Sequence, residues 1–111
     1  MTMIGGNIEA ILQQKTGSTL NEIGERIQSW TDVQKLWGWL DLTNEANSTG
    51  YGYNAKLQES THVFICDHTT VDRFVDDKRL IVNGLVYDVL LIDDPMELHQ
   101  QLEIFLKYVG R

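Results

Sequence analysis

The sequence predicts an all-β fold, a small barrel or sandwich of five or six strands with one long loop and one short helical turn. Apolar and polar residues alternate in several segments, which is the period of a strand with one buried face. Asn83-Gly84 separates the apolar runs "RLIV" and "LVYDVLLI". This pattern is typical of a two-residue type I′ hairpin, in which both turn residues take positive φ. Several strands with short connections point to a small barrel or sandwich.

The totals fit one soluble domain. The chain has 111 residues, 42% of them apolar, and one cysteine, so no disulfide forms within it. The amino terminus lacks the basic start and apolar run of a signal peptide. No aliphatic run is long enough to span a bilayer. We expect a single domain over 1–111 in a reducing, cytoplasmic compartment, with a flexible segment at 1–6, a long loop at 43–58 and no membrane partner.

The net charge of the chain is negative. Nine basic residues stand against sixteen acidic ones, for a net charge of −7. Proteins that bind nucleic acid tightly need clustered Lys and Arg to displace phosphate counterions, so tight binding is disfavoured. A negative surface lets DNA pass without adhering, although solubility alone also explains the charge.

The first expected strand covers residues 7–14, with Ile8, Ala10 and Leu12 on one face. Gly17 and Gly24 follow as strand breakers. We therefore expect a turn there and a bent approach to the next strand.

The segment "WTDVQKLWGWLDL", residues 30–42, has the strongest strand composition, because it is rich in tryptophan and includes β-branched residues. At period two, Val33, Trp37 and Trp39 share one face, and Leu36, Leu40 and Leu42 share the other. Gly38 indicates a bend or bulge such as a barrel corner. Since both faces are apolar, one interpretation is that one face meets the core and the other meets something else, such as a neighbouring subunit. An equally good interpretation is that one tryptophan simply covers an end of the barrel. The candidates for subunit interface or core are Trp30, Trp37, Trp39 and Phe64.

The segment "NEANSTGYGYNAK", residues 44–56, is far longer than the two to five residues of a tight hairpin. Its glycines, Gly50 and Gly52, let the backbone change direction at little steric cost. Tyr51 and Tyr53 offer large amphipathic surfaces. The segment is either a disordered connection or a working part, and both hold if it orders on assembly.

Residues 60–68 predict another strand, with Phe64 and Cys66 on one side. The charged stretch that follows is interpreted as a connection, with Val71, Phe74 and Val75 as its anchors and room for one helical turn.

The tail admits two interpretations. Asp94 and Pro95 can cap and start a helix. The helical stripe would be Leu98, Leu102, Phe105 and Val109, whereas Leu102, Ile104, Leu106 and Tyr108 alternate as a strand. We favour a short helical turn at 95–100 followed by a final strand, and helix and strand both stay open for residues 96–108.

The sequence offers little catalytic chemistry. The histidines His62, His68 and His99 lack metal-ligand spacing. The acidic pairs at 76–77 and 93–94 sit where carboxylates usually face solvent. No nucleophile motif, phosphate loop or dinucleotide fingerprint occurs. We expect no catalytic residue, no metal, no cofactor and no enzymatic activity.

The order of these segments resembles that of the small head-closure, or head–tail connector, proteins of tailed bacteriophages and prophages. A tryptophan-led strand, "WTDVQKLWGWLDL", precedes a long polar loop. The loop is followed by a strand that opens with "STHVFI" and by a charged connection. After these come "RLIVNGLVYDVLLIDDP" and a terminal strand-like segment. The resemblance covers residues 8–109. The sequence departs from the family pattern at His68, where many such proteins have an arginine soon after the third strand.

The resemblance implies a small SH3-like barrel that assembles as a ring, commonly of twelve, beneath the portal of a filled capsid. The ring would seal the DNA channel and present a docking surface for the tail. The plug role carried over from the family falls on Ser48, Thr49, Gly50, Tyr51, Gly52 and Tyr53. The implied partners are further copies of the chain, a portal or adaptor protein, and a tail terminator or tail-completion protein. Packaged DNA would pass nearby without specific binding. The implied location is the head–tail interface of the virion, after assembly in the bacterial cytoplasm.

Three alternatives remain. One is a neighbouring connector, such as a tail-completion or minor capsid protein. Another is a small barrel that binds single-stranded nucleic acid by stacking bases on its tyrosines and tryptophans, which the acidic charge disfavours. The weakest is an enzyme with a histidine-based site.

Overall fold

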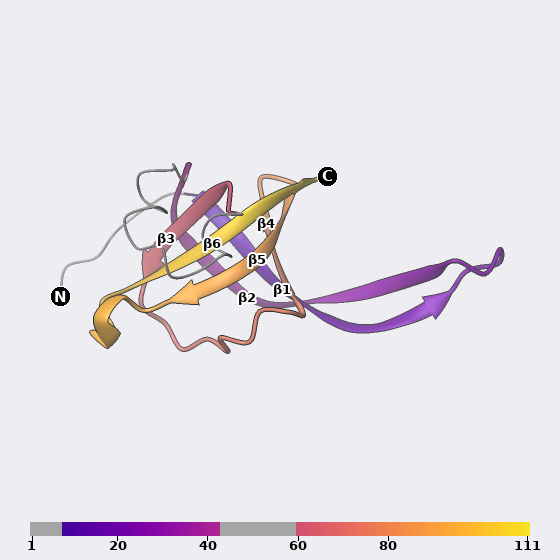
Figure 1. The fold of residues 1–111 in the computed structure, drawn as a ribbon, viewed down its shortest axis with the longest axis horizontal. Coiled ribbons are helices and arrows are strands. Elements are labelled where there is room, and N and C mark those ends of the chain that lie inside the picture. Colours follow the sequence, from indigo (N-terminus) through magenta and orange to yellow (C-terminus); the bar gives the residue numbers. More distant parts are fainter. Residues whose placement is uncertain (1–7, 43–59) are drawn as a thin grey trace.

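The protein, seen in a computed structural model that describes residues 8–42 and 60–111, is a closed barrel of antiparallel strands in the order β1-β2-β3-β6-β5-β4 (Figure 1). The elements are β1 (Ile8–Leu20), β2 (Arg26–Leu42), β3 (His62–Asp67), β4 (Lys78–Val82), β5 (Leu85–Asp93), the 3₁₀ turn η1 (Pro95–Glu97) and β6 (Gln101–Gly110). The predicted all-β fold, a small barrel with one short helical turn, is confirmed. The segments expected at 1–6 and 43–58 lie outside the described residues.

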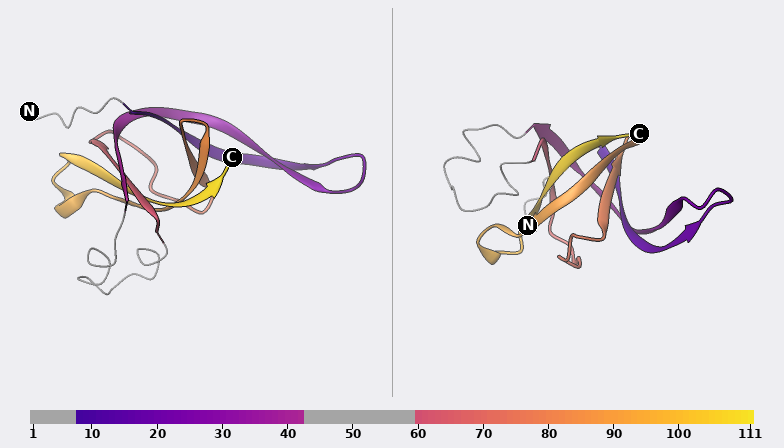
Figure 2. Two further views of the ribbon diagram at one scale, coloured as in Figure 1. Left: turned by 90° about the horizontal axis from the view of Figure 1, so that it is seen from above. Right: turned by 45° about the vertical axis from the view of Figure 1, so that its right-hand side comes forward.

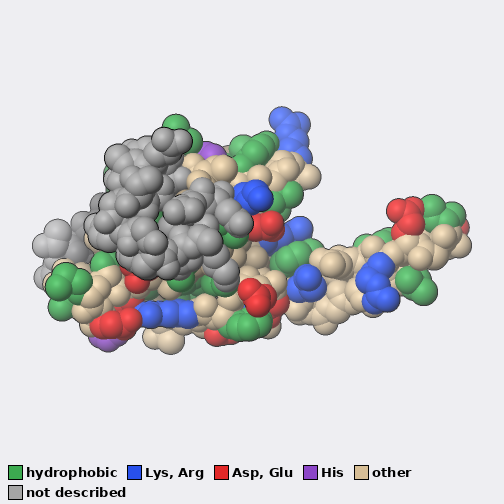
Figure 3. Space-filling view, viewed as in Figure 1, with side chains coloured by type: hydrophobic (Ala, Val, Ile, Leu, Met, Phe, Trp, Pro, Cys, Tyr) green, Lys and Arg blue, Asp and Glu red, His purple; other side chains and the backbone are tan. Residues whose placement is uncertain are grey.

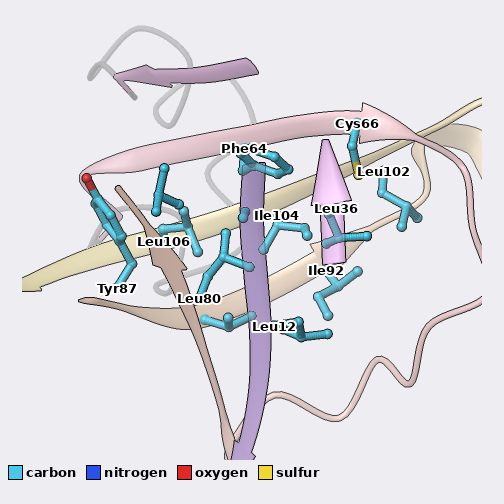
Figure 4. Close-up of a cluster of buried hydrophobic side chains, with 13 residues drawn as sticks. Leu12, Leu36, Phe64, Cys66, Leu80, Tyr87, Ile92, Leu102, Ile104 and Leu106 are labelled. Carbon is cyan, nitrogen blue, oxygen red and sulfur yellow. The ribbon is translucent and has the colours of Figure 1, made fainter. Parts of the chain in front are cut away.

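The core follows from strand alternation. Inward-facing side chains from all six strands meet in one cluster (Figure 4). Its fully buried members include Leu12, Phe64, Leu80, Leu102, Ile104 and Leu106. In the tail, every second residue from Leu102 to Leu106 is inside, whereas Leu98 and Val109 of the helical stripe are exposed. The segment is therefore a strand that follows the period-two pattern, as we favoured from the sequence.

Gly38 marks a close approach between β2 and β3. It lies opposite Cys66 in the ladder, and a Cβ built at Gly38 would lie 2.1 Å from the carbonyl oxygen of Ile65. Only glycine fits there without moving backbone. The residue thus lets the backbones of β2 and β3 approach closely at the point where the two strands begin to pair.

The first hairpin extends well beyond the barrel. β1 pairs with β4 only as far as Gln14, and β2 meets β3 only from Gly38 onward. Past Lys15, the two strands continue as a ribbon paired with each other. We call residues 16–29 the arm; it projects to one side of the barrel (Figures 1 and 2). The whole molecule measures 50 × 30 × 23 Å.

The arm contradicts the turn and bend expected near Gly17. The extra residue there is absorbed by a register shift between Lys15 and Gly17, so the strand continues. The chain reverses only at 21–25, where the Asn21 side chain accepts hydrogen bonds from the backbone N–H groups of Ile23 and Glu25, at 3.1 and 2.8 Å. Asn21 therefore sets the turn by mimicking a backbone acceptor.

The connection from β3 to β4 crosses one end of the barrel without a helical turn. Val71 and Val75 pack against the core as expected, but Phe74 is exposed, so its expected anchoring role is wrong. The connection is also held by an ion-pair cluster, in which the buried ammonium of Lys78 lies 3.2 Å from Asp72 and 3.0 Å from Asp77. Within the described ranges, no helix is long and apolar enough to cross a membrane.

Candidate functional site

The free end of the arm carries an exposed apolar cluster, which we call the arm tip. Leu20, Ile23 and Ile27 are 66%, 78% and 48% exposed, and Figure 3 shows hydrophobic side chains at this end of the molecule. An isolated two-stranded hairpin is only marginally stable in water. Apolar side chains gathered on such a projection are typical of a contact surface.

The root of the arm is braced against the barrel. Trp30 lies beneath the guanidinium of Arg79, whose carbon is 4.1 Å from the ring centroid, and Lys15 Nζ is 5.7 Å from that centroid. Arg79 also donates a hydrogen bond from Nε to Gln13 Oε1 at 2.7 Å, and Gln13 donates to Asp32 at 2.7 Å. This network joins β1, β2 and β4 where the arm leaves the barrel, so the arm's direction is fixed by the fold.

A second apolar surface lies on the outer side of β2. Val33, Trp37 and Trp39 are each about half exposed, whereas Leu36 from the alternate positions is in the core. A shallow groove of about 260 Å³ runs beside Trp37 and is also lined by His68 and Thr69. We call the outward side chains of Val33, Trp37 and Trp39 the tryptophan face. Leu42, grouped with the inward leucines in the sequence, is exposed at the end of β2, although it is still paired with His62 of β3.

The remaining predicted residues are dispersed. Phe64 is completely buried in the core, and Trp30 is half-buried at the arm root. Asn83 and Gly84 form the turn between β4 and β5 with φ of 53° and 78°. The plug candidates at 48–53 lie outside the described residues.

One cluster was missed from the sequence. His68 and His99, together with Arg73, surround the carboxylate of Asp94, which is buried at the start of η1. Burial opposes ionisation of this carboxyl. Hydrogen bonds from the backbone and ring of His99, and the charge of nearby histidine, nevertheless hold the pKa of Asp94 below its ordinary value. Asp94 followed by Pro95 resembled a helix cap in sequence, yet its side chain caps no helical N–H. Spacing alone gave no sign that residues 31 apart would meet here.

The structure is therefore a small closed barrel that carries an arm and two apolar outer surfaces. The family model of the phage head completion protein matches residues 7–109, so the chain belongs to that family. It is a structural component of phage head completion, and hence of the virion, that acts together with other virion proteins.

The fold has a counterpart among solved structures. The solution structure of protein SF1141 from Shigella flexneri 2a is similar with a TM-score of 0.67 and 18% sequence identity, covering 97% of this chain and 96% of that one. At this identity the likeness shows a shared fold. Among curated proteins no relative matches.

Proposed function

We propose that this protein is a head-closure, or head–tail connector, subunit that forms a ring beneath the portal, retains the packaged DNA and offers the tail a docking surface. The observation that carries the proposal is the presence of two separate apolar surfaces, the arm tip and the tryptophan face. A closed head-to-tail ring needs two different surfaces on every subunit, each complementary to the other. A monomer has no evident use for either.

In the proposed ring, the arm tip of one subunit packs against the tryptophan face of the next. The braced root at Trp30 points the arm in one direction, which favours a repeated, regular contact. Twelve copies would match the usual portal symmetry of the family. The portal or an adaptor protein would lie on one side of the ring, and a tail terminator or tail-completion protein on the other.

Electron microscopy tests the ring directly. The protein is added to DNA-filled capsids that carry a portal, and we expect an added ring beneath it. Changing Leu20, Ile23 and Ile27 together to Ser should abolish the ring but leave the folded barrel. Met96→Ser is the matched control, because Met96 is an exposed apolar residue on η1, away from the arm (Figure 1). A ring that forms normally with the triple variant would refute the proposed contact.

The loop at 44–56 is proposed as the part that blocks the DNA channel. The net charge of −7 supports a channel that DNA passes without adhering. Deleting Ser48 to Tyr53 should leave folding intact, because the entropy of loop closure changes slowly with loop length. DNA retention in capsids should then fail while the ring still forms. Normal retention with the shortened loop would exclude the plug role without affecting the ring.

A further inference from the structure

Three nitrogen-bearing side chains converge on the carboxylate of Asp94, at the end of the barrel where β5 leads into η1. The Asp94 side chain is wholly buried. Its Oδ2 atom lies 2.5 Å from His99 Nδ1, 3.6 Å from His68 Nε2 and 3.3 Å from Arg73. Its Oδ1 accepts the backbone N–H of His99 at 3.0 Å. The cluster joins the segment after β3 to the turn before β6.

We propose that His68, Asp94 and His99 form a binding site for one divalent transition-metal ion of the Zn²⁺ type. The ligand atoms that the three residues offer all lie within 4.8 Å of one another. Two imidazole nitrogens and one carboxylate oxygen are a donor set that suits Zn²⁺ and its neighbours rather than Ca²⁺ or Mg²⁺, which prefer oxygen alone.

The two distances to Asp94 need only a small adjustment, whereas the most widely separated ligand atoms, 4.8 Å apart, must approach by about 1.5 Å. Zinc binds imidazole nitrogen and carboxylate oxygen at about 2.0–2.1 Å, so two ligand atoms of a tetrahedral ion lie ~3.3 Å apart. The distance from His68 Nε2 to Asp94 is already close to this value. The contact between His99 Nδ1 and Asp94 must open by less than an ångström, which a rotation of the exposed His99 ring provides. The side chains of His68 and His99 are 30% and 62% exposed, so a hydrated ion reaches the site and water completes its coordination.

Arg73 is the main obstacle, because its positive charge lies beside the site. Its guanidinium, however, makes two hydrogen bonds to the carboxylate of Glu97, at 3.0 and 3.3 Å. Glu97 therefore balances Arg73, and the negative charge of Asp94 remains for the ion. A carboxylate oxygen has more than one lone pair, so Arg73 can stay bonded to Asp94 as an outer partner that orients the ligand.

The backbone of the η1 turn supplies an independent indication. Met96, Glu97 and His99 all have positive φ, of 56°, 55° and 58°, which is unfavourable for residues with a Cβ. Such strained residues cluster at binding sites, where the surrounding structure holds them in place. Here the strained turn folds His99 back over Asp94, so that backbone N–H and ring both face the carboxylate.

Zinc titration of the full, metal-stripped chain by isothermal calorimetry tests the proposal. We expect one Zn²⁺ per chain, and at least about tenfold weaker binding in each of His68→Gln and His99→Gln. His62→Gln is the matched control, because the third histidine packs on Tyr87, with ring centroids 5.1 Å apart, outside the cluster. Circular dichroism checks that each variant keeps its strands. Titration of the unmutated chain with Co²⁺ adds a readout that needs no variant, since the visible absorption of Co²⁺ changes on coordination by imidazole.

Absence of Zn²⁺ binding to the unmutated chain would overturn the proposal. So would binding that is unchanged in both His68→Gln and His99→Gln, or weakened equally by His62→Gln. A Co²⁺ spectrum identical to that of the free aqueous ion would have the same consequence.

Discussion

The guanidinium carbon of Arg79 lies 4.1 Å from the centroid of the Trp30 ring, and this contact ties β4 to the root of the arm. The β2 residues that precede Trp30 belong to the arm, while Arg79 lies within the barrel. The pair therefore transmits the rigidity of the barrel to the ribbon that projects from it.

Replacing Trp30 with Ala should loosen the arm but preserve the barrel. A cation–π contact of this kind is worth about 0.5–2 kcal/mol, and packing is lost with it. Amide hydrogen exchange in residues 16–29 should accelerate, while exchange in β5 and β6 stays slow. Trp37→Ala, on the same strand but away from the brace, serves as the control. Equal protection of the arm in wild type and Trp30→Ala would disprove the bracing role.

Gly38 and Gly17 should respond in opposite ways to alanine. A Cβ at Gly38 would meet the backbone of Ile65 at 2.1 Å, whereas one at Gly17 would have no atom within 4 Å. We expect Gly38→Ala to lower the free energy of unfolding by at least about 1–3 kcal/mol, the usual cost of overpacking. Gly17→Ala should change it little. Urea denaturation of both variants decides, and similar midpoints would show that β2 can shift away from β3 at low cost.

Phe64 and Trp39 test the difference between core and outer surface. Phe64 is completely buried, so Phe64→Ala should cost about 3–5 kcal/mol in the isolated chain. Trp39 is 49% exposed, and Trp39→Ala should cost about 1–2 kcal/mol there, because roughly half its transfer free energy is at stake. In capsid reconstitution, Trp39→Ala should impair ring formation more than its loss of stability explains. A stability loss for Trp39→Ala as large as that for Phe64→Ala would contradict this division.

Burial, with a smaller effect from the charge of Asp67, raises the pKa of the Cys66 thiol from 9.0 to about 11. A pKa that is higher in the folded state means that folding favours the protonated thiol. The stabilisation is therefore complete below pH 9 and is lost as the pH rises toward 11. The free energy of unfolding should fall across this range more steeply in the wild type than in Cys66→Ala. Alkylation by iodoacetamide at pH 8 should be slow until the chain unfolds; fast alkylation of the native protein would contradict the assignment.

Local pattern predicted most of the barrel. The Asn83-Gly84 hairpin needs only two residues of special conformation, and the alternation from Leu102 to Leu106 needs only one buried face. Both are properties of a few neighbouring residues, so the sequence displays them directly. The inward position of Phe64 and the outward position of Trp37 likewise follow from period two once the sheet is known to close.

The arm and the Asp94 cluster depend on information that no local window contains. As a glycine, Gly17 is expected to end a strand, but the strand continues through a bulge in its pairing with β2. That bulge depends on the sequences of both strands. His68 and His99 meet because β3 and β6 are neighbours in the barrel. Predicting their contact would have required the strand order as well as the strands.

The two strands of the arm differ from those of the barrel in their edges. A closed barrel satisfies its own ladder all the way round and offers no edge to another strand. From residue 16 to residue 29, however, the described strand pairs join β1 and β2 only to each other, so the ribbon has two open edges. An open edge accepts a strand from another chain through main-chain hydrogen bonds. Recognition through the backbone depends little on side-chain identity, so an arm of this kind can keep its place in an assembly while its sequence drifts.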